Sequence, residues 1–316
     1  MKYRIGVDMG GTAIKAGVID ENNRIISKIS IPTDPSLSFE VIVKDLADGA
    51  KAVAQKSGFS IEDFPCMGVG MPGSLNPQTG LLVFSNNVGW KNVPFQKELE
   101  KHIPIPIYIG NDANCAVIGE AIAGAAKDRK NVVMLTLGTG VGGGIIIDRK
   151  LFCGADGMGV ELGHMFLVLD GELCTCGIKG CVEAYASVTA LIRQTRAMME
   201  LHPESTMHDY AKREGNITGR TSFDCAKLGD QAALNVVKQY TRYLAATIGS
   251  LVTIFRPEVI LIGGGLSNEK DFLLGRLNEC VGDYTFAADI IGIPPIIKAE
   301  LGNDAGIIGA AYLDVM

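Results

Sequence analysis

Residues 5–20 read IGVDMGGTAIKAGVID, which predicts an apolar strand, a turn at Gly10 and Gly11, and a second strand that ends in an acidic turn. Residues 133–148 read VMLTLGTGVGGGIIID and repeat this order, with Gly138 at the place of Gly10. Two unrelated hairpins of similar composition would look the same. A duplicated domain would instead present two glycine-rich turns, whose backbone N–H groups could hold phosphate oxygens.

Further regular elements surround both hairpins. Strands are predicted at residues 24–31, 66–71, 105–110 and 259–262, and helices at 38–57, 183–199, 230–255 and 304–315. Because antiparallel strands occur together with strand–helix alternation, the pattern predicts an α/β fold. We expect an N-terminal α/β lobe over residues 1–113, onto which the C-terminal helix 304–316 packs back. A larger C-terminal α/β lobe is expected over residues 114–303.

The composition limits the classes of function. The 316 residues carry a net charge of -6, and the lack of a long basic run argues against a nucleic-acid-binding protein. The first eight residues lack the apolar core of a signal peptide, and the longest charge-free, glycine-poor apolar run, Leu244 to Phe255, is too short to cross a bilayer. The eight cysteines do not resemble a disulfide framework, because three of them lie within eight positions. We therefore expect a cytoplasmic protein without nucleic-acid or membrane partners.

Two common nucleotide-binding motifs can be excluded. The glycines at 138, 140 and 143 match the spacing of a dinucleotide fingerprint, but the β-branched run Ile145–Ile147 follows where that motif needs a helix. The chain also contains no P-loop consensus. A third glycine cluster, Gly263–Gly265, follows an apolar strand as the first two do.

Three cysteines and a histidine predict a metal site. Cys174, Cys176 and Cys181 lie close together in the chain, and His164 precedes them by ten residues. Three thiolates and one imidazole form a ligand set typical of structural zinc, and a closed four-ligand site leaves no position for substrate. Gly177 and Gly180 suit a tight metal-binding knuckle. The alternative is a group of three buried free thiols.

Carboxylates provide the candidate acid–base groups. Asp112 stands where a predicted strand runs into a helix, so it is either the N-cap of that helix or a general base for a hydroxyl proton. Glu161 and Glu183 lie next to the proposed metal ligands. They either support those ligands or bind a hydroxyl-rich ligand, and the spacing alone does not decide between these roles.

The combination of motifs resembles the ROK family, which includes bacterial repressors and sugar kinases. The matching motifs run in family order over nearly the whole chain: Asp8-x-Gly10-Gly11-Thr12, Gly70-Met71-Pro72-Gly73, Asn87-Val88-Gly89-Trp90, Gly110-Asn111-Asp112-Ala113-Asn114, residues 137–144, Glu161-Leu162-Gly163-His164 and Cys174-x-Cys176-x4-Cys181-x-Glu183. The resemblance implies a two-lobed, actin-like fold of the hexokinase type with an interlobe cleft. It also implies an ATP-dependent hexose kinase that acts on the 6-hydroxyl of glucose, and a homodimer.

The resemblance also implies roles for individual residues. Asp112 would be the catalytic base. The hexose would be bound by Gly73, Asn87, Asn111, Asp112, Glu161, His164 and Glu183. ATP, with its Mg²⁺, would be bound by Asp8, Gly10, Gly11, Thr12, Lys15, Gly138, Thr139, Gly140, Gly142, Gly264 and Gly265. Structural zinc on His164 and the three cysteines would direct His164 and Glu183 toward the sugar.

The chain departs from the family pattern in one place and leaves other functions open. Val160 stands where the family usually has glycine, which is expected to alter the local backbone. Other substrates remain possible, namely N-acetylmannosamine, N-acetylglucosamine, fructose or allose, and polyphosphate remains a possible donor. A sugar sensor without turnover is a different class, and such a sensor would not need Asp112. A repressor is disfavoured, because no winged helix precedes Asp8.

Overall fold

The structure is a computed structural model that describes residues 3–34, 36–85 and 88–316. The chain forms two compact units. Unit 1 contains residues 1–133, 144–160 and 299–316, and unit 2 contains residues 134–143 and 161–298. The sequence placed the boundary between residues 113 and 114, whereas the helix that spans this position, Asp112–Ala123, lies entirely in unit 1.

The first sheet lies in unit 1 and has the strand order β3-β2-β1-β4-β8. Its strands are β1 (Arg4–Met9), β2 (Ala13–Ile19), β3 (Ile25–Pro32), β4 (Met67–Met71) and β8 (Ile107–Asn111). The pairs β1–β2 and β2–β3 are antiparallel, whereas β1–β4 and β4–β8 are parallel. Helix α1 (Phe39–Lys56) buries its apolar residues against this sheet.

The second sheet repeats this order as β11-β10-β9-β12-β13. Its strands are β9 (Val132–Leu137), β10 (Val141–Ile147), β11 (Lys150–Phe152), β12 (Val259–Gly263) and β13 (Ile296–Lys298). As in the first sheet, the outer hairpin pair β10–β11 is antiparallel and the pair β12–β13 is parallel. The shared order extends the sequence repeat from one hairpin to a whole sheet and supports a duplicated domain.

Helices make up most of unit 2. The predicted helix 183–199 is two helices, α4 (Glu183–Ala186) and α5 (Val188–Leu201), because extended Ser187 separates them and caps α5. Helix α8 (Gln231–Phe255) starts at Asp230, whose side chain accepts the N–H of Ala233. The other helices of unit 2 are α6 (Met207–Glu214), α7 (Thr221–Lys227), α9 (Asp271–Cys280) and α10 (Ala288–Ile291).

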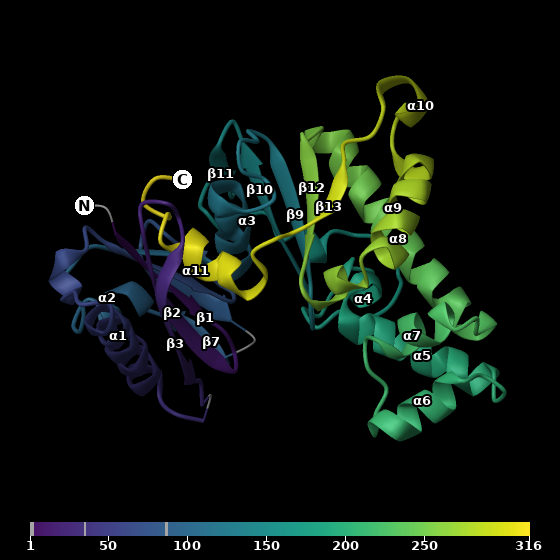
Figure 1. Ribbon diagram of the computed structural model, residues 1–316, viewed down its shortest axis with the longest axis horizontal. Helices are drawn as coiled ribbons and strands as arrows, with labels where there is room; N and C mark the ends of the chain where they lie inside the picture. The colour runs from purple at the N-terminus through teal and green to yellow at the C-terminus, as the bar shows by residue number, and fades with distance from the viewer. Residues whose placement is uncertain (1–2, 35, 86–87) are drawn as a thin grey trace. The chain divides into compact units, whose positions relative to one another are not determined.

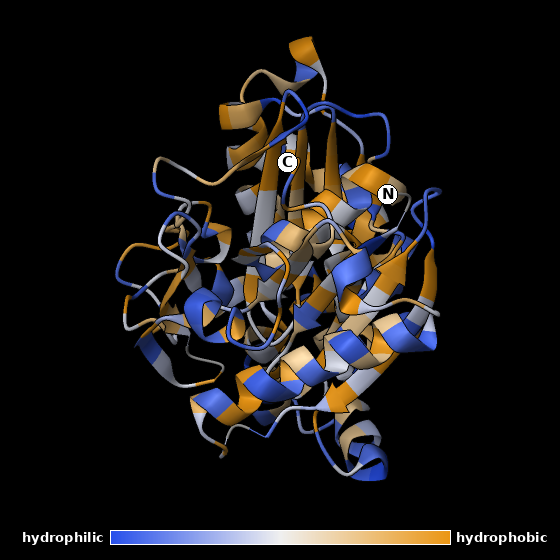
Figure 2. Ribbon diagram, turned by 90° about the vertical axis from the view of Figure 1, so that its left-hand side faces the viewer, coloured by the Kyte–Doolittle hydropathy of each residue, from blue (hydrophilic) through white to orange (hydrophobic). Residues whose placement is uncertain are grey.

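Short elements complete unit 1, and the sequence did not predict them. They are α2 (Phe95–Leu99) and a three-stranded sheet of β5 (Ser74–Asn76), β6 (Leu81–Ser85) and β7 (Trp90–Val93). Figure 2 shows the hydropathy pattern behind this packing: helices carry blue and orange segments together, whereas the strands are largely orange. Within the described part of the chain, no helix is long and apolar enough to span a membrane.

The C-terminal segment returns to unit 1. Helix α11 (Ala305–Ala310) packs against β1 and α3 (Asp112–Ala123), and Figure 1 draws it in yellow beside the purple strands. The fully buried Glu120 of α3 accepts hydrogen bonds from the N–H groups of Ala125, Glu300 and Leu301 at 2.8–3.1 Å. These bonds join α3 to the segment before α11, which explains why α3 belongs to unit 1.

Candidate active site

Asn111 and Asp112 stand where β8 runs into α3. The side-chain oxygen of Asn111 accepts the N–H groups of Ala113 (2.8 Å) and Asn114 (3.2 Å), so Asn111 is the N-cap of the helix. Its amide nitrogen donates to the carbonyl oxygen of Gly73 (3.2 Å). The N-cap role considered for Asp112 is therefore wrong, and the Asp112 carboxylate is not needed for capping.

The carboxylates of Asp112 and Asp8 both hold protons more readily than exposed carboxylates. Burial raises the pKa of Asp112 above its ordinary value. Burial also raises the pKa of Asp8, to about 6; the charge of Lys15 opposes this shift and the charge of Asp112 adds to it. The β1–β2 register pairs Asp8 with Lys15, and the ammonium lies 3.8 Å from Asp8 Oδ2.

The first glycine-rich turn joins β1 to β2. The N–H of Gly10 donates to the carbonyl oxygen of Ala13 (2.8 Å). Thr33 fixes the turn from the side, because its hydroxyl donates to the carbonyl oxygen of Gly10 (3.2 Å) and its N–H to that of Thr12 (3.0 Å). Nothing in the sequence marked Thr33 as part of this region.

The predicted site residue Asn87 lies outside the described residues.

The second glycine-rich turn joins β9 to β10 and is held by the start of α5. The N–H of Gly138 donates to the carbonyl oxygen of Gly140 (3.0 Å). Val188 donates its N–H to the carbonyl oxygen of Gly138 (2.9 Å), and the Thr189 hydroxyl donates to that of Thr139 (2.8 Å). Sequence reasoning missed both contacts, because these residues are distant in the chain and belong to no motif.

Glu183 joins this turn to the cysteine cluster. Its Oε2 accepts the N–H of Val141 at 3.0 Å, and a Cβ on Gly140 would come within 2.2 Å of the same oxygen. Its Oε1 accepts the hydroxyl of Thr175 at 2.8 Å and the thiol of Cys174 at 3.5 Å. The carboxylate is thus fixed from two sides.

The four predicted metal ligands gather in unit 2. The ligand atoms of His164, Cys174, Cys176 and Cys181 all lie within 4.8 Å of one another. The sulfurs of Cys176 and Cys181 are 3.7 Å apart, and His164 Nδ1 is 3.7 Å from the Cys174 sulfur. Zinc–sulfur bonds of about 2.3 Å at tetrahedral angles separate two sulfurs by about 3.8 Å, so the arrangement fits a tetrahedral ion. No two of these cysteines are joined by a disulfide.

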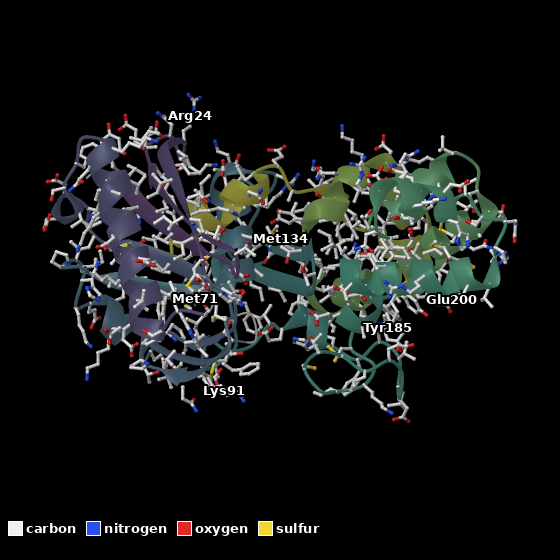
Figure 3. All side chains as sticks on the ribbon, turned by 90° about the horizontal axis from the view of Figure 1, so that it is seen from below. Arg24, Met71, Lys91, Met134, Tyr185 and Glu200 are labelled. Atoms are coloured by element: carbon white, nitrogen blue, oxygen red, sulfur yellow. The ribbon has the colours of Figure 1, made fainter. Side chains whose placement is uncertain are left out.

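The knuckle has the backbone that its glycines predicted. Gly177 and Gly180 both have φ near 89°, a conformation that L-residues with side chains rarely adopt. Tyr185, labelled in Figure 3, packs in one cluster with Cys174 and Cys181. Its hydroxyl accepts the N–H of Glu172 (2.6 Å). These contacts attach the knuckle to α4.

The backbone before the knuckle is strained. Val160 has φ of 68°, in the left-handed region that is unfavourable for a β-branched residue and open to glycine. Glu161 follows it, is exposed, and precedes the 3₁₀-helix η2 (Leu162–His164), which carries His164. The departure from the family pattern is therefore accommodated by strain at Val160.

The predicted residues form two sets. Unit 1 holds Asp8, Gly10, Gly11, Thr12, Lys15, Gly73, Asn111 and Asp112, and unit 2 holds Gly138, Thr139, Gly140, Gly142, Glu161, His164, Glu183, Gly264, Gly265 and the three cysteines. The structure brings neighbours together within each set. It stays a prediction that the two sets line one interlobe cleft.

Known proteins match the chain over almost its full length. The model of the ROK family matches residues 4–315. A glucokinase of Thermotoga maritima is 36% identical over 98% of this chain and 96% of that protein. An N-acetyl-D-glucosamine kinase of Aliivibrio salmonicida is 33% identical over 98% of this chain and 99% of that protein.

A solved structure supports the same assignment. A ROK family glucokinase from Streptomyces griseus, crystallised with glucose and AMPPNP, superposes with a TM-score of 0.84 at 34% identity and covers 98% of both chains. With the repeated sheets, this match confirms the expected α/β, actin-like fold. The chain belongs to the ROK family.

Proposed function

We propose that the protein is a glucokinase, which transfers the γ-phosphoryl group of ATP to the 6-hydroxyl of glucose. Several glucokinases are 36% identical to it over nearly the full chain, a closer match than the N-acetyl-D-glucosamine kinases. The observation that carries the proposal is the pairing at the end of β8. Asn111 caps the helix, so the partly buried Asp112 carboxylate, whose Oδ1 also accepts the N–H of Ala113 at 2.8 Å, is not required as the cap and can take part in chemistry.

Asp112 is the general base in this proposal. Its carboxylate accepts the proton of the sugar 6-hydroxyl as the oxygen attacks the γ-phosphorus. The bond from that phosphorus to the bridging oxygen then breaks, and ADP leaves with the bonding electron pair. Burial improves the base, because the raised pKa of Asp112 brings it closer to the pKa of the hydroxyl that gives up the proton.

The glycine-rich turns and the Asp8–Lys15 pair would bind ATP and its Mg²⁺. The backbone N–H groups of Gly11, Thr12, Thr139 and Gly140 would donate to phosphate oxygens, because those of Gly10 and Gly138 already donate within their turns, and Lys15 would add positive charge. Asp8 offers the carboxylate oxygens that Mg²⁺ prefers, so it would hold the ion that accompanies ATP. That ion neutralises charge on the phosphates. Gly264 and Gly265 would lie against the nucleoside.

Zinc is proposed as a structural ion in the knuckle. Its support is the ligand spacing, which fits four tetrahedral bonds from His164 and the three cysteines. The ion would hold the knuckle so that His164 and Glu183 keep their orientation toward the sugar. Glu161, Asn111 and Gly73 would provide other contacts with the sugar. A homodimer remains part of the proposal.

An ADP-release assay with a panel of hexoses tests the function. We expect the highest kcat/KM with glucose and a requirement for Mg²⁺. A direct assay of glucose 6-phosphate, which detects transfer from either donor, should show ATP to be a better donor than polyphosphate. A higher kcat/KM with N-acetylglucosamine, N-acetylmannosamine, fructose or allose would overturn the substrate assignment. Sugar binding by calorimetry without any ADP release would instead support the sensor.

A further inference from the structure

The turn that follows β12 is fixed at several points. Gly264 has φ of 80°, and a Cβ there would lie 2.2 Å from the carbonyl oxygen of Leu137. The 3₁₀-helix η3 (Gly265–Glu269) follows directly. The buried Ser267 donates its hydroxyl to the carbonyl oxygen of Gly264 (2.7 Å), and Lys298 donates to the side chain of Asn268 (2.8 Å). The position of Gly264 and Gly265 therefore depends on where η3 is held.

The strongest of these anchors is an ion pair at the end of η3. The side chain of Glu269 is only 8% exposed, and its Oε2 lies 2.5 Å from the ammonium of Lys227, the last residue of α7. A carboxylate with so little contact with water is stable only when it is paired, because removal of the partner leaves a buried charge. Lys227 thus holds η3 through a carboxylate that is largely shielded from water.

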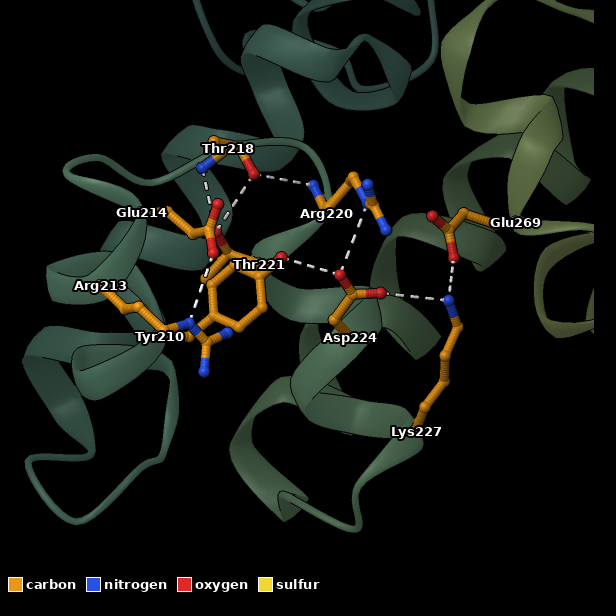
Figure 4. Close-up of polar contacts among 9 residues, drawn as sticks. All are labelled: Tyr210, Arg213, Glu214, Thr218, Arg220, Thr221, Asp224, Lys227 and Glu269. Carbon is orange, nitrogen blue, oxygen red and sulfur yellow. Dashed lines mark hydrogen bonds and ion pairs between the residues drawn. The ribbon is translucent and has the colours of Figure 1, made fainter.

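Lys227 belongs to a network that joins α6, α7 and η3 (Figure 4). Its ammonium also donates to Asp224 Oδ1 at 3.3 Å. The other oxygen of Asp224 accepts the Tyr210 hydroxyl of α6 at 2.7 Å, and the Arg220 guanidinium lies 3.5 Å from it. The network therefore holds the Lys227 side chain against α7, and the same ammonium also pairs with Glu269 of η3.

The same region approaches the second glycine-rich turn. A Cβ on Gly219, just before α7, would lie 2.9 Å from Val188 and 3.7 Å from Leu266 of η3. Val188 is the residue that donates its N–H to Gly138. The loop before α7 is thus packed against the supports of both turns that unit 2 contributes to the proposed ATP site.

We propose that Lys227 is a positioning residue for ATP: through Glu269 it holds η3, and thereby Gly264 and Gly265, in the place that the nucleoside needs. This inference rests on the proposed kinase function. The ion pairs and hydrogen bonds of Lys227 described above lead to α7 and η3, which carry no residue assigned to the sugar, so we expect the effect to be specific for the nucleotide.

The substitution Lys227→Met tests the proposal, because it keeps the length of the side chain and removes its charge. We expect the KM for ATP to rise roughly five- to twentyfold, the size of an ordinary coupling between sites. The KM for glucose and kcat should change less than twofold. The matched control is Lys28→Met, since Lys28 forms an ion pair of the same length, 2.5 Å, with Asp304 in unit 1 and should leave both KM values unchanged.

A double variant and a binding measurement exclude a general loss of structure. In Lys227→Met/Glu269→Gln no charge remains buried without a partner, but the link to η3 is still absent, so the KM for ATP should stay raised; a return to the parent value would assign the loss to the buried charge. Calorimetry with AMPPNP should show the same loss without turnover. An equal rise of both KM values, or an unchanged affinity of Lys227→Met for AMPPNP, overturns the positioning role alone. A parent protein that binds no AMPPNP overturns the proposed function as well.

Discussion

Asn111 and Asp112 divide helix capping and proton acceptance between them, and only the first of these tasks is open to both residue types. Both side chains can cap a helix, and the cap is the residue whose side-chain oxygen reaches the N–H groups of the first turn. Here the Asn111 oxygen makes both capping bonds. The sequence located this pair at the strand end, but it could not assign the cap, because the choice depends on the path of the backbone between β8 and α3.

The first prediction concerns Asp112→Asn. The amide keeps the shape of the side chain but cannot accept the hydroxyl proton, so kcat should fall about a hundred- to ten-thousandfold. Affinity for glucose, measured by calorimetry, should change much less. Asp20→Asn, at the turn that follows β2, serves as the control and should keep full kcat. A near-normal kcat in Asp112→Asn would remove the general base from the mechanism.

The second prediction concerns Asp8→Asn and the pH dependence of stability. The pKa of Asp8 is about 6 in the folded protein and 3.8 in the reference state, so ionisation of Asp8 destabilises the fold as the pH rises through this interval. The Asn variant avoids this penalty. Its free energy of unfolding should exceed that of the parent by about 1–3 kcal/mol above pH 6, with activity largely lost.

Urea denaturation near pH 4 and pH 7.5 provides the measurement. The stability difference between Asp8→Asn and the parent should shrink toward zero near pH 4, where both side chains are neutral. A gain of equal size at both values would assign the effect to packing. A loss of stability at pH 7.5 would show that the ion pair with Lys15 outweighs burial.

At the scale of elements, the sequence predicted long periodic segments and missed short or broken ones. Strands β1, β2 and β4 and helices α1 and α8 were predicted, because many apolar residues repeat with a clear period. The strands β5–β7 were missed, because three to five residues show no reliable period. The break at Ser187 was also missed. Serine is compatible with a helix, and only the need for an N-cap at α5 identifies it.

The knuckle carries the third prediction. Cys176→Ser should abolish the binding of one zinc ion per chain, measured by elemental analysis, and raise the KM for glucose. The metal would no longer hold His164 in place. Thr175 and Cys174, which donate hydrogen bonds to Glu183, would also no longer be held by the metal site. The KM for ATP should rise less, because Val188 and Thr189 hold the second glycine-rich turn independently of the knuckle. Unchanged glucose kinetics in a folded, zinc-free variant would disprove the coupling.

At the scale of the whole molecule, the repeat was detectable in the sequence only as one hairpin. The two five-stranded sheets share their strand order, although the segments that connect their parallel strands differ in length and content. The sequence could not locate the boundary between the units correctly, because the boundary depends on contacts between residues about 180 positions apart. Glu120 with Glu300 and Leu301 is the clearest example.

Glu120→Gln is the fourth prediction. The amide loses the negative charge and one of the acceptor oxygens that receive three N–H groups, so unfolding should become easier by about 1.5–3 kcal/mol. Thermal denaturation measures the change, and hydrogen exchange should show faster opening of residues 299–316. Glu279→Gln, at an exposed position of α9, should change neither. Equal melting temperatures of Glu120→Gln and the parent would contradict the anchoring role.

The return of residues 299–316 to unit 1 has a consequence for synthesis on the ribosome. The sheet of unit 1 is made early, but α11, which covers it at Gly6 and Gly68, emerges after all of unit 2. Backbone carbonyls of Ile307 and Ala310 approach these glycines so closely that no other segment with the same fit is expected to substitute. A nascent chain must therefore keep this apolar face of its first sheet uncovered until translation is nearly complete. Chaperone binding during that interval would protect the unfinished unit from aggregation.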